Sequence, residues 1–140
     1  QSNTSGHGNT ALGINALRNN SSGNTNTAIG INAMESNSTG NYNTAIGEVA
    51  LNNNTNGNGN VAVGHKALET NTSGGFNVSI GSYSLQKSTN SSSNVAIGYE
   101  AMRDNISNQG NVAIGIPVIV DAASEYDLKI FIDKTEQVWL

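Results

Sequence analysis

The sequence predicts an all-β fold, a parallel β-roll (β-solenoid) in which the chain makes seven turns of 17 residues. Each turn carries one copy of the motif Asn-x-Ala-x-Gly, with Ser79 in place of alanine once. The apolar residues keep the same places in every copy, a phasing that a disordered Asn- and Ser-rich chain lacks. The motif's glycines recur every 17 residues, at Gly13, Gly30, Gly47, Gly64, Gly81, Gly98 and Gly115.

The repeat divides the chain into three parts. Residues 1–8 form an N-terminal lead-in, 9–115 form the seven-repeat shaft or head, and 116–140 form a C-terminal cap or trimerisation segment. We number each repeat from its motif asparagine as positions 1 to 17, so that turn 1 begins at Asn9 and turn 7 at Asn111.

Positions 2 and 4 of each repeat predict a short strand. They hold Thr or Val and then Leu, Ile or Val, and this alternation is typical of a strand with one buried face. Position 9 is always Leu, Met or Ile, which predicts a second short strand over positions 7–10. We therefore expect positions 2, 4 and 9 to point into the roll, and positions 12–17, rich in Asn, Ser, Thr and Gly, to form turns.

Charged residues in the repeats occur only at positions 6, 7, 10 and 11, so these positions should face water. Positions 1, 3 and 5 are Asn, Ala (or Ser) and Gly and carry no charge, although they are expected to point away from the roll's own core. We predict that other chains cover them in a parallel homotrimer and that the asparagines stack as amide ladders. The predicted trimer and stacking face comprises Asn26, Ala28, Asn43, Ala45, Asn60, Ala62, Asn94 and Ala96.

The repeat pattern ends after Gly115, close to the only proline, Pro117. The alternation in 127–133 predicts a half-buried strand in which Leu128, Ile130 and Ile132 share one face. A last short strand is expected at 138–140, and the whole segment should cap the open end of the roll. A carbohydrate site around Trp139 is the alternative.

Composition excludes several classes of function. The net charge of −4 without a basic cluster argues against nucleic-acid binding, and no apolar run is long enough for a membrane span. The chain has no cysteine, and its two histidines, His7 and His65, lie without metal-ligand company. No carboxylate pair or phosphate-binding loop is present. We expect no catalytic residues, no metal and no cofactor, and therefore no enzyme.

Direct binding would use exposed positions that vary between repeats. Aromatic residues there offer a flat face with a polar edge, which suits a cell-surface glycan or protein, although packing along the rim is the simpler interpretation. The candidate ligand-binding residues are Tyr42, His65, Phe76, Tyr83, Tyr99 and Trp139.

The pattern Asn-Thr-Ala-Ile-Gly-x-x-Ala-Leu/Met-x-x-Asn-x-x-Gly in 26–40 and 43–57 resembles the head repeats of trimeric autotransporter adhesins. It is even more similar to the 17-residue repeats of phage tail fibres and related bacterial surface fibres. The resemblance implies a left-handed roll, three chains side by side, and attachment to a host cell from a virion or other extracellular surface. Such fibres often continue into a self-cleaving C-terminal chaperone, so this chain, starting at Gln1, is expected to be a processed product or fragment.

Two alternatives stay open. One is a bacterial trimeric adhesin head. The other is a monomeric β-solenoid that binds ice or another repetitive lattice, which would need an outward threonine array. The threonines at position 2, Thr10, Thr27 and Thr44, are expected to face inward, which argues against lattice binding.

Overall fold

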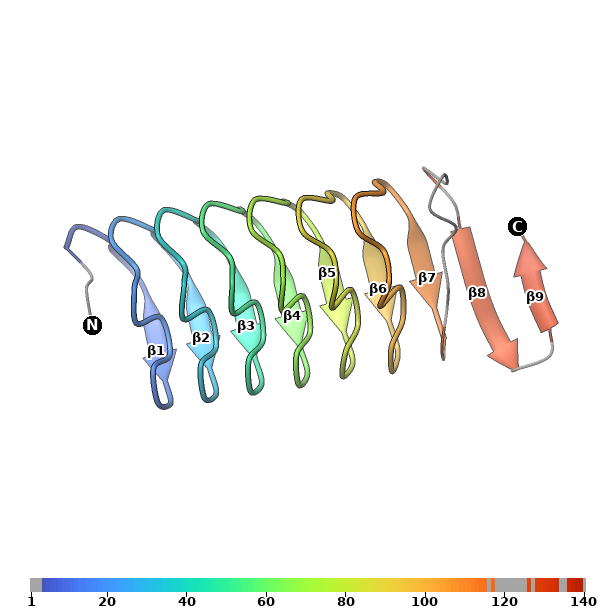
Figure 1. Ribbon diagram of the computed structural model, residues 1–140, viewed down its shortest axis with the longest axis horizontal. Helices are drawn as coiled ribbons and strands as arrows, with labels where there is room; N and C mark the ends of the chain where they lie inside the picture. The colour runs from blue at the N-terminus through green and yellow to red at the C-terminus, as the bar shows by residue number, and fades with distance from the viewer. Residues whose placement is uncertain (1–3, 116, 118–125, 127, 134–135, 140) are drawn as a thin grey trace.

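The chain folds as a parallel β-solenoid of about seven turns (Figure 1). The computed structural model describes residues 4–115, 117, 126, 128–133 and 136–139, and these residues contain strands and turns but no helix. One three-residue strand per turn stacks beside the next in sequence order. These strands are β1 (Thr10–Leu12), β2 (Thr27–Ile29), β3 (Thr44–Ile46), β4 (Val61–Val63), β5 (Val78–Ile80), β6 (Val95–Ile97) and β7 (Val112–Ile114).

The strands pair in parallel with a register of one repeat, so that Thr27 lies opposite Thr44 and Ala28 opposite Ala45. Two further strands, β8 (Leu128–Asp133) and β9 (Glu136–Trp139), extend the sheet at its C-terminal end. β8 continues the parallel ladder, whereas β9 pairs with β8 antiparallel. Val112 pairs with Leu128, so the last connection is one residue shorter than the repeat.

The two faces of each strand are the reverse of those expected. In turns 2 to 7 the Asn of position 1 and the Ala or Ser of position 3 are fully buried within the single chain, whereas positions 2 and 4 are half-buried or exposed. The predicted trimer face therefore lies inside the roll: Asn26, Ala28, Asn43, Ala45, Asn60, Ala62, Asn94 and Ala96. Each turn is narrow, and its inner wall accepts small and flat side chains because the large one comes from the opposite wall.

That large side chain is position 9, as predicted: Leu17, Met34, Leu51, Leu68, Leu85 and Met102 are all buried. The expected second strand is absent from turns 1 to 6, where positions 7–10 form a tight turn instead. In turn 3, for example, Val49 at position 7 and Leu51 at position 9 both have the left-handed conformation, with φ of 60° and 51°. Left-handed residues on either side of position 8 bend the chain sharply, so no strand can form there.

Hydrogen bonds between turns hold this strained backbone in place. Val49 N–H donates to the carbonyl of Ile31 in the preceding turn at 2.9 Å, and Leu51 N–H donates to that of Ala67 in the next turn at 2.9 Å. The inter-turn ladder therefore continues around the corner beyond the strands. Buried N–H groups keep their partners, and the positive φ angles are fixed by the whole stack.

The predicted amide ladder is confirmed at position 1. Asn60 Nδ2 lies 3.2 Å from Asn43 Oδ1, and Asn77 Nδ2 lies 3.0 Å from Asn60 Oδ1. Each Oδ1 also accepts the backbone N–H of the asparagine in the next turn, 3.0 Å for Asn77 on Asn60. The column runs from the half-buried Asn9 to Asn111, so every turn is tied to its neighbour through asparagine amides, which are fully buried from turn 2 onwards.

In the C-terminal strand β8, Lys129 pairs with the inward-facing Ala113 and is 6% exposed, while Leu128 and Ile130 are half-buried. The expectation that the aliphatic residues form the buried face is therefore wrong for Leu128 and Ile130. The register of the roll, set by the parallel ladder to β7, decides which face points inward. The side chain of Ile132 lies outside the described residues.

Candidate binding surfaces

The outer side of the strands forms a continuous, largely apolar surface, which we call the strand face and define as positions 2 and 4 of β1 to β7. It contains no charged residue in any of the seven turns. Leu12 is 67% exposed, and Ile46, Ile80 and Ile114 are between 37% and 39% exposed. Contiguous apolar surface of this kind on a folded chain is typical of an interaction site.

Threonine occupies part of this strand face. Thr10 is exposed, and Thr27 and Thr44 are half-buried at the same outward position. The expectation that this threonine column faces inward is therefore wrong, for the same reason that positions 1 and 3 proved to be inside. From turn 4 onwards valine takes the place of threonine.

Three of the candidate ligand-binding residues meet at the C-terminal ends of the strands. The rings of His65 and Tyr83 lie edge to face with centroids 5.2 Å apart, and those of Tyr83 and Tyr99 with centroids 6.1 Å apart. They come from turns 4, 5 and 6 and occupy positions 6 or 7, directly after the motif glycine. The stack thus builds one aromatic row, the histidine–tyrosine row, from residues of three neighbouring turns.

A carboxylate lies at each end of this row. Glu48 Oε2 lies 3.5 Å from His65 Nδ1, and Glu100 follows Tyr99. The pKa of Tyr99 is raised above its usual value, chiefly by the negative charge of Glu100. The hydrogen bond that the phenol O–H donates to this carboxylate raises it further. Tyr99 therefore stays a neutral hydrogen-bond donor throughout the physiological range.

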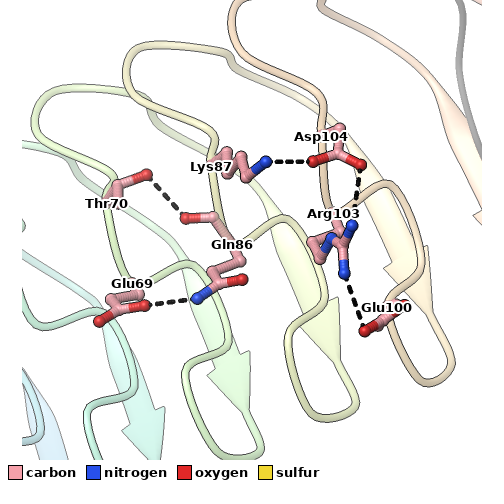
Figure 2. A network of polar contacts seen from close by, with 7 residues as sticks. All are labelled: Glu69, Thr70, Gln86, Lys87, Glu100, Arg103 and Asp104. Carbon is pink, nitrogen blue, oxygen red and sulfur yellow. Dashed lines mark hydrogen bonds and ion pairs between the residues drawn. The ribbon is translucent and has the colours of Figure 1, made fainter.

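Residues at positions 10 and 11 of turns 4 to 6, together with Glu100 at position 7, form a polar network (Figure 2). Arg103 Nη1 lies 2.9 Å from Glu100 Oε1, and Arg103 Nη2 lies 3.3 Å from Asp104 Oδ2. Lys87 Nζ lies 2.6 Å from the other oxygen of Asp104, Oδ1. The hydrogen bond from Lys87, with a further contribution from Arg103, holds the pKa of Asp104 below its usual value. The charges at positions 7, 10 and 11 thus pair with one another along a half-exposed surface.

The other candidate residues lie elsewhere. Tyr42 and Phe76 occupy position 17, directly before the motif asparagine, and are strongly exposed at the N-terminal ends of the strands. Tyr126 has the same exposed, left-handed conformation as these two, and sequence reasoning missed it because the 16-residue connection displaces it by one residue. Trp139 belongs to β9, but its side chain lies outside the described residues.

No family model, curated protein or solved structure matches this chain. In the part of the chain that the structure describes, no helix could cross a membrane. Among the same residues, no group of three or more His, Asp or Glu side chains could hold a metal ion. The candidate binding surfaces of the chain are therefore three: the strand face, the histidine–tyrosine row and the exposed aromatic residues of position 17.

Proposed function

We propose that this chain is a structural and receptor-binding segment of a trimeric surface fibre that attaches to a host cell, similar to a phage tail fibre. Its place would be a virion surface or another extracellular surface. The observation that carries the proposal is the uncharged, apolar strand face, which follows the stack over seven turns. The resemblance of the repeat to tail-fibre repeats supports the same function.

The partner that fits the strand face best is a second and a third copy of this chain. Its position 4 aliphatic side chains recur once per turn, at the inter-strand spacing of about 4.8 Å, and are exposed in turns 1, 3, 5 and 7 and half-buried in turns 2, 4 and 6. A partner must offer apolar contacts with that same rise along the whole length, which another copy in parallel orientation does. Three such faces packed around one axis, with left-handed rolls, give the proposed homotrimer, and 116–140 would cap it at the C-terminal end.

A bacterial trimeric adhesin head is the closest alternative, because it would use the same trimer on a cell instead of a virion. A monomeric solenoid that binds ice or another lattice is the second alternative. Thr10, Thr27 and Thr44 point outward and not inward as expected, which removes the argument made against lattice binding from the sequence. Their replacement by valine in the later turns makes the array short. Thermal hysteresis of the protein solution would identify this activity.

The test is the native mass, measured by light scattering after size exclusion at several concentrations. We expect a mass close to three times the 14.5 kDa of one chain. Ile46→Lys and Ile80→Lys place charges on the strand face and should give monomers, since a desolvated unpaired charge is costly. The control Asn52→Lys places a charge at position 10, where the repeats already carry charges, and should leave the trimer intact. A wild-type mass of one chain would refute the trimer.

Receptor contact by the histidine–tyrosine row is tested separately. Once a host is identified, Tyr83→Ala together with Tyr99→Ala should reduce adsorption of the protein to host cells while the native mass stays unchanged. Adsorption at the wild-type level would remove both tyrosines from the binding surface and leave this segment as a spacer.

A further inference from the structure

Three exposed aromatic residues share one position of the repeat. Tyr42, Phe76 and Tyr126 are 69%, 71% and 77% exposed, and each lies one residue before the inward-facing position 1 or, for Tyr126, at the equivalent place before β8. Because equivalent positions of a solenoid stack in a line, the three rings follow the long axis of the stack. We call them the corner row. It lies at the N-terminal ends of the strands, away from the histidine–tyrosine row at the C-terminal ends.

The backbone holds these rings in fixed places. All three residues have the left-handed conformation, with φ of 59°, 59° and 63°, which aromatic residues seldom adopt. Each N–H donates to a carbonyl of the preceding turn, at 2.9 Å from Phe76 to Asn58 and 3.1 Å from Tyr126 to Gln109. The inter-turn ladder thus keeps an otherwise unfavourable conformation in place.

Glycines in the neighbouring turns give two of the rings a flat place to lie. A Cβ atom on Gly59 would lie 3.0 Å from the ring of Phe76, and one on Gly110 would lie 2.4 Å from the ring of Tyr126. These rings therefore rest against glycine backbone and leave their other face open to solvent. Gly59 and Gly110 occupy position 17 themselves, so the stack folds without an aromatic residue there, and packing does not explain the row.

The surface around Tyr42 and Phe76 is polar but uncharged, whereas Tyr126 stands between two acidic residues, Glu125 and Asp127, in the sequence. Positions 12–17 of turns 1 to 6 contain no charged residue and one aliphatic residue, Ile106. Next to the row, the amides of Asn24, Asn41 and Asn58 form a ladder with Nδ2 to Oδ1 distances of 3.0 and 3.1 Å. Fixed amides beside flat rings offer hydrogen bonds and apolar stacking together.

We infer that the corner row binds a linear, uncharged glycan that runs along the axis of the stack. The inference rests on the proposed function of surface attachment and adds the ligand class to it. Two turns separate Tyr42 from Phe76 and three separate Phe76 from Tyr126, which at the spacing of stacked strands is about 10 Å and about 14 Å. A chain of sugar rings laid along the row can place an apolar ring face on each aromatic and its hydroxyls near the amides.

Other ligand classes fit this surface less well. A nucleic acid or an acidic glycan would need cations, and these positions carry none. A protein partner would need more apolar area than three separated rings and one isoleucine provide. A neutral polysaccharide needs only the flat faces and the neutral hydrogen-bonding groups that the corner row offers.

The test is affinity electrophoresis of the native protein in gels that contain one soluble neutral polysaccharide each: hydroxyethyl cellulose, galactomannan, xyloglucan or glycogen. We expect at least one of the first three, which have linear backbones, to retard the wild-type chain more strongly than the branched glycogen does. Tyr42→Gly together with Phe76→Gly installs the residue that the chain itself has at this position, so the fold should survive. Loss of two stacking faces should weaken retardation by about tenfold or more. The control Thr25→Gly with Ser93→Gly removes non-aromatic side chains at the same position and should leave retardation unchanged.

The inference is overturned if none of the three polysaccharides with linear backbones retards the wild-type chain, if the aromatic double variant is retarded equally, or if the control loses retardation too. Light scattering of the same samples separates this result from the proposed function. A trimer without retardation would refute the glycan site alone. A monomer that is retarded would support the glycan site and refute the trimeric fibre.

Discussion

Two columns of buried asparagine run through the roll, and they differ in continuity. The column at position 1 is unbroken, whereas the column at position 12 connects Asn20, Asn37, Asn54 and Asn71 and then stops at Ser88. Among the described residues, Asn71 Oδ1 has no hydrogen-bond partner, because serine lacks the amide that would donate to it. The same repeat thus contains one column that tolerates no exception and another that does.

The reason lies at position 15, where the two columns meet. The carbonyl of Gly57 accepts from Asn43 Nδ2 at 2.8 Å and from Asn54 Nδ2 at 3.0 Å. A Cβ atom on Gly57 would lie 2.3 Å from Asn54 Oδ1, so a side chain at position 15 changes the hydrogen bonds of an asparagine at position 12. In turn 6, where position 15 is Asn108, Asn105 Oδ1 accepts the N–H of Asn108 within the same turn, and Asn105 Nδ2 lies 3.4 Å from the carbonyl of Asn108. The glycine therefore creates the space that the second column needs.

Turn 5 shows what happens without that glycine. Ser91 stands at position 15, the residue at position 12 has shrunk to Ser88, and their hydroxyls contact each other. Ser79 and Ser84 form a second buried hydroxyl pair in the same turn. Turn 5 has therefore exchanged the amide link between turns for hydroxyl links within the turn, while the position 1 column passes through it unchanged.

The largest expected effect comes from breaking the unbroken column. Asn60→Ala removes the acceptor of the buried Asn77 N–H and should lower the free energy of unfolding by about 3 kcal/mol, since orphaned N–H groups are rare and costly. Asn54→Ala leaves Asn37 Oδ1 without its donor, a state that Asn71 Oδ1 already has, and should lower it by only about 1–2 kcal/mol. Urea unfolding followed by circular dichroism measures both. Equal losses would show that the two columns are equivalent.

The second prediction restores the broken column. Ser88→Asn together with Ser91→Gly gives Asn71 Oδ1 a donor and should raise the stability by about 1 kcal/mol. Ser88→Asn alone should lower the stability by about 1–3 kcal/mol, because the larger side chain collides with Ser91. A double-mutant cycle on melting temperature or urea midpoint measures this coupling. Additive effects would mean that position 15 does not control position 12.

A third, exposed amide column sharpens the same comparison. Asn15 Nδ2 donates to Asn32 Oδ1 at 3.0 Å at position 7, and Val49 interrupts the series in the next turn. Val49→Asn should raise the stability by up to about 1 kcal/mol, because asparagine tolerates the left-handed conformation much better than a β-branched residue. Val49→Ala, which relieves the branching without supplying an amide, is the matched control. A melting temperature for the asparagine variant below that of the alanine control would contradict the prediction.

The 17-residue period, and the structural features that depend on it, could be predicted from the sequence. The glycine spacing placed all seven parallel strands, position 9 was correctly among the three positions expected to point inward, and the amide ladder at position 1 followed from identical residues at identical places. The charged residues at positions 6, 7, 10 and 11 are indeed half-exposed or exposed in turns 1 to 6. These features depend only on the repetition of the chain, which sequence reports directly.

The faces of the strand could not be read from hydrophobicity. The rule that β-branched residues lie inside failed because a turn of 17 residues encloses too little space for three large side chains. The better signal was constancy between repeats, since Asn at position 1 never varies while position 2 changes from Thr in turns 1 to 3 to Val in turns 4 to 7. The histidine–tyrosine row was named residue by residue, but its contacts needed the inter-turn stacking, and Tyr126 was hidden by a single-residue deletion.

The smallest expected effect is the pH dependence of stability, which should arise from the charged surface and not from the neutral interior. The folded chain holds the pKa of Asp104 below its unfolded value through Lys87 and Arg103, so this carboxylate stabilises the fold above its unfolded pKa near 3.8. That contribution is lost as the pH falls through the lower pKa of the folded state. Because Asp104 is about half exposed, solvent screening limits this contribution to about a few tenths of a kcal/mol.

The amide columns carry no charge, so Asn60→Ala should lower the free energy of unfolding equally at acidic and neutral pH. Asp104→Asn should remove part of the acid dependence of the melting temperature, and an unchanged profile would show that the surface ion pairs contribute nothing to the stack.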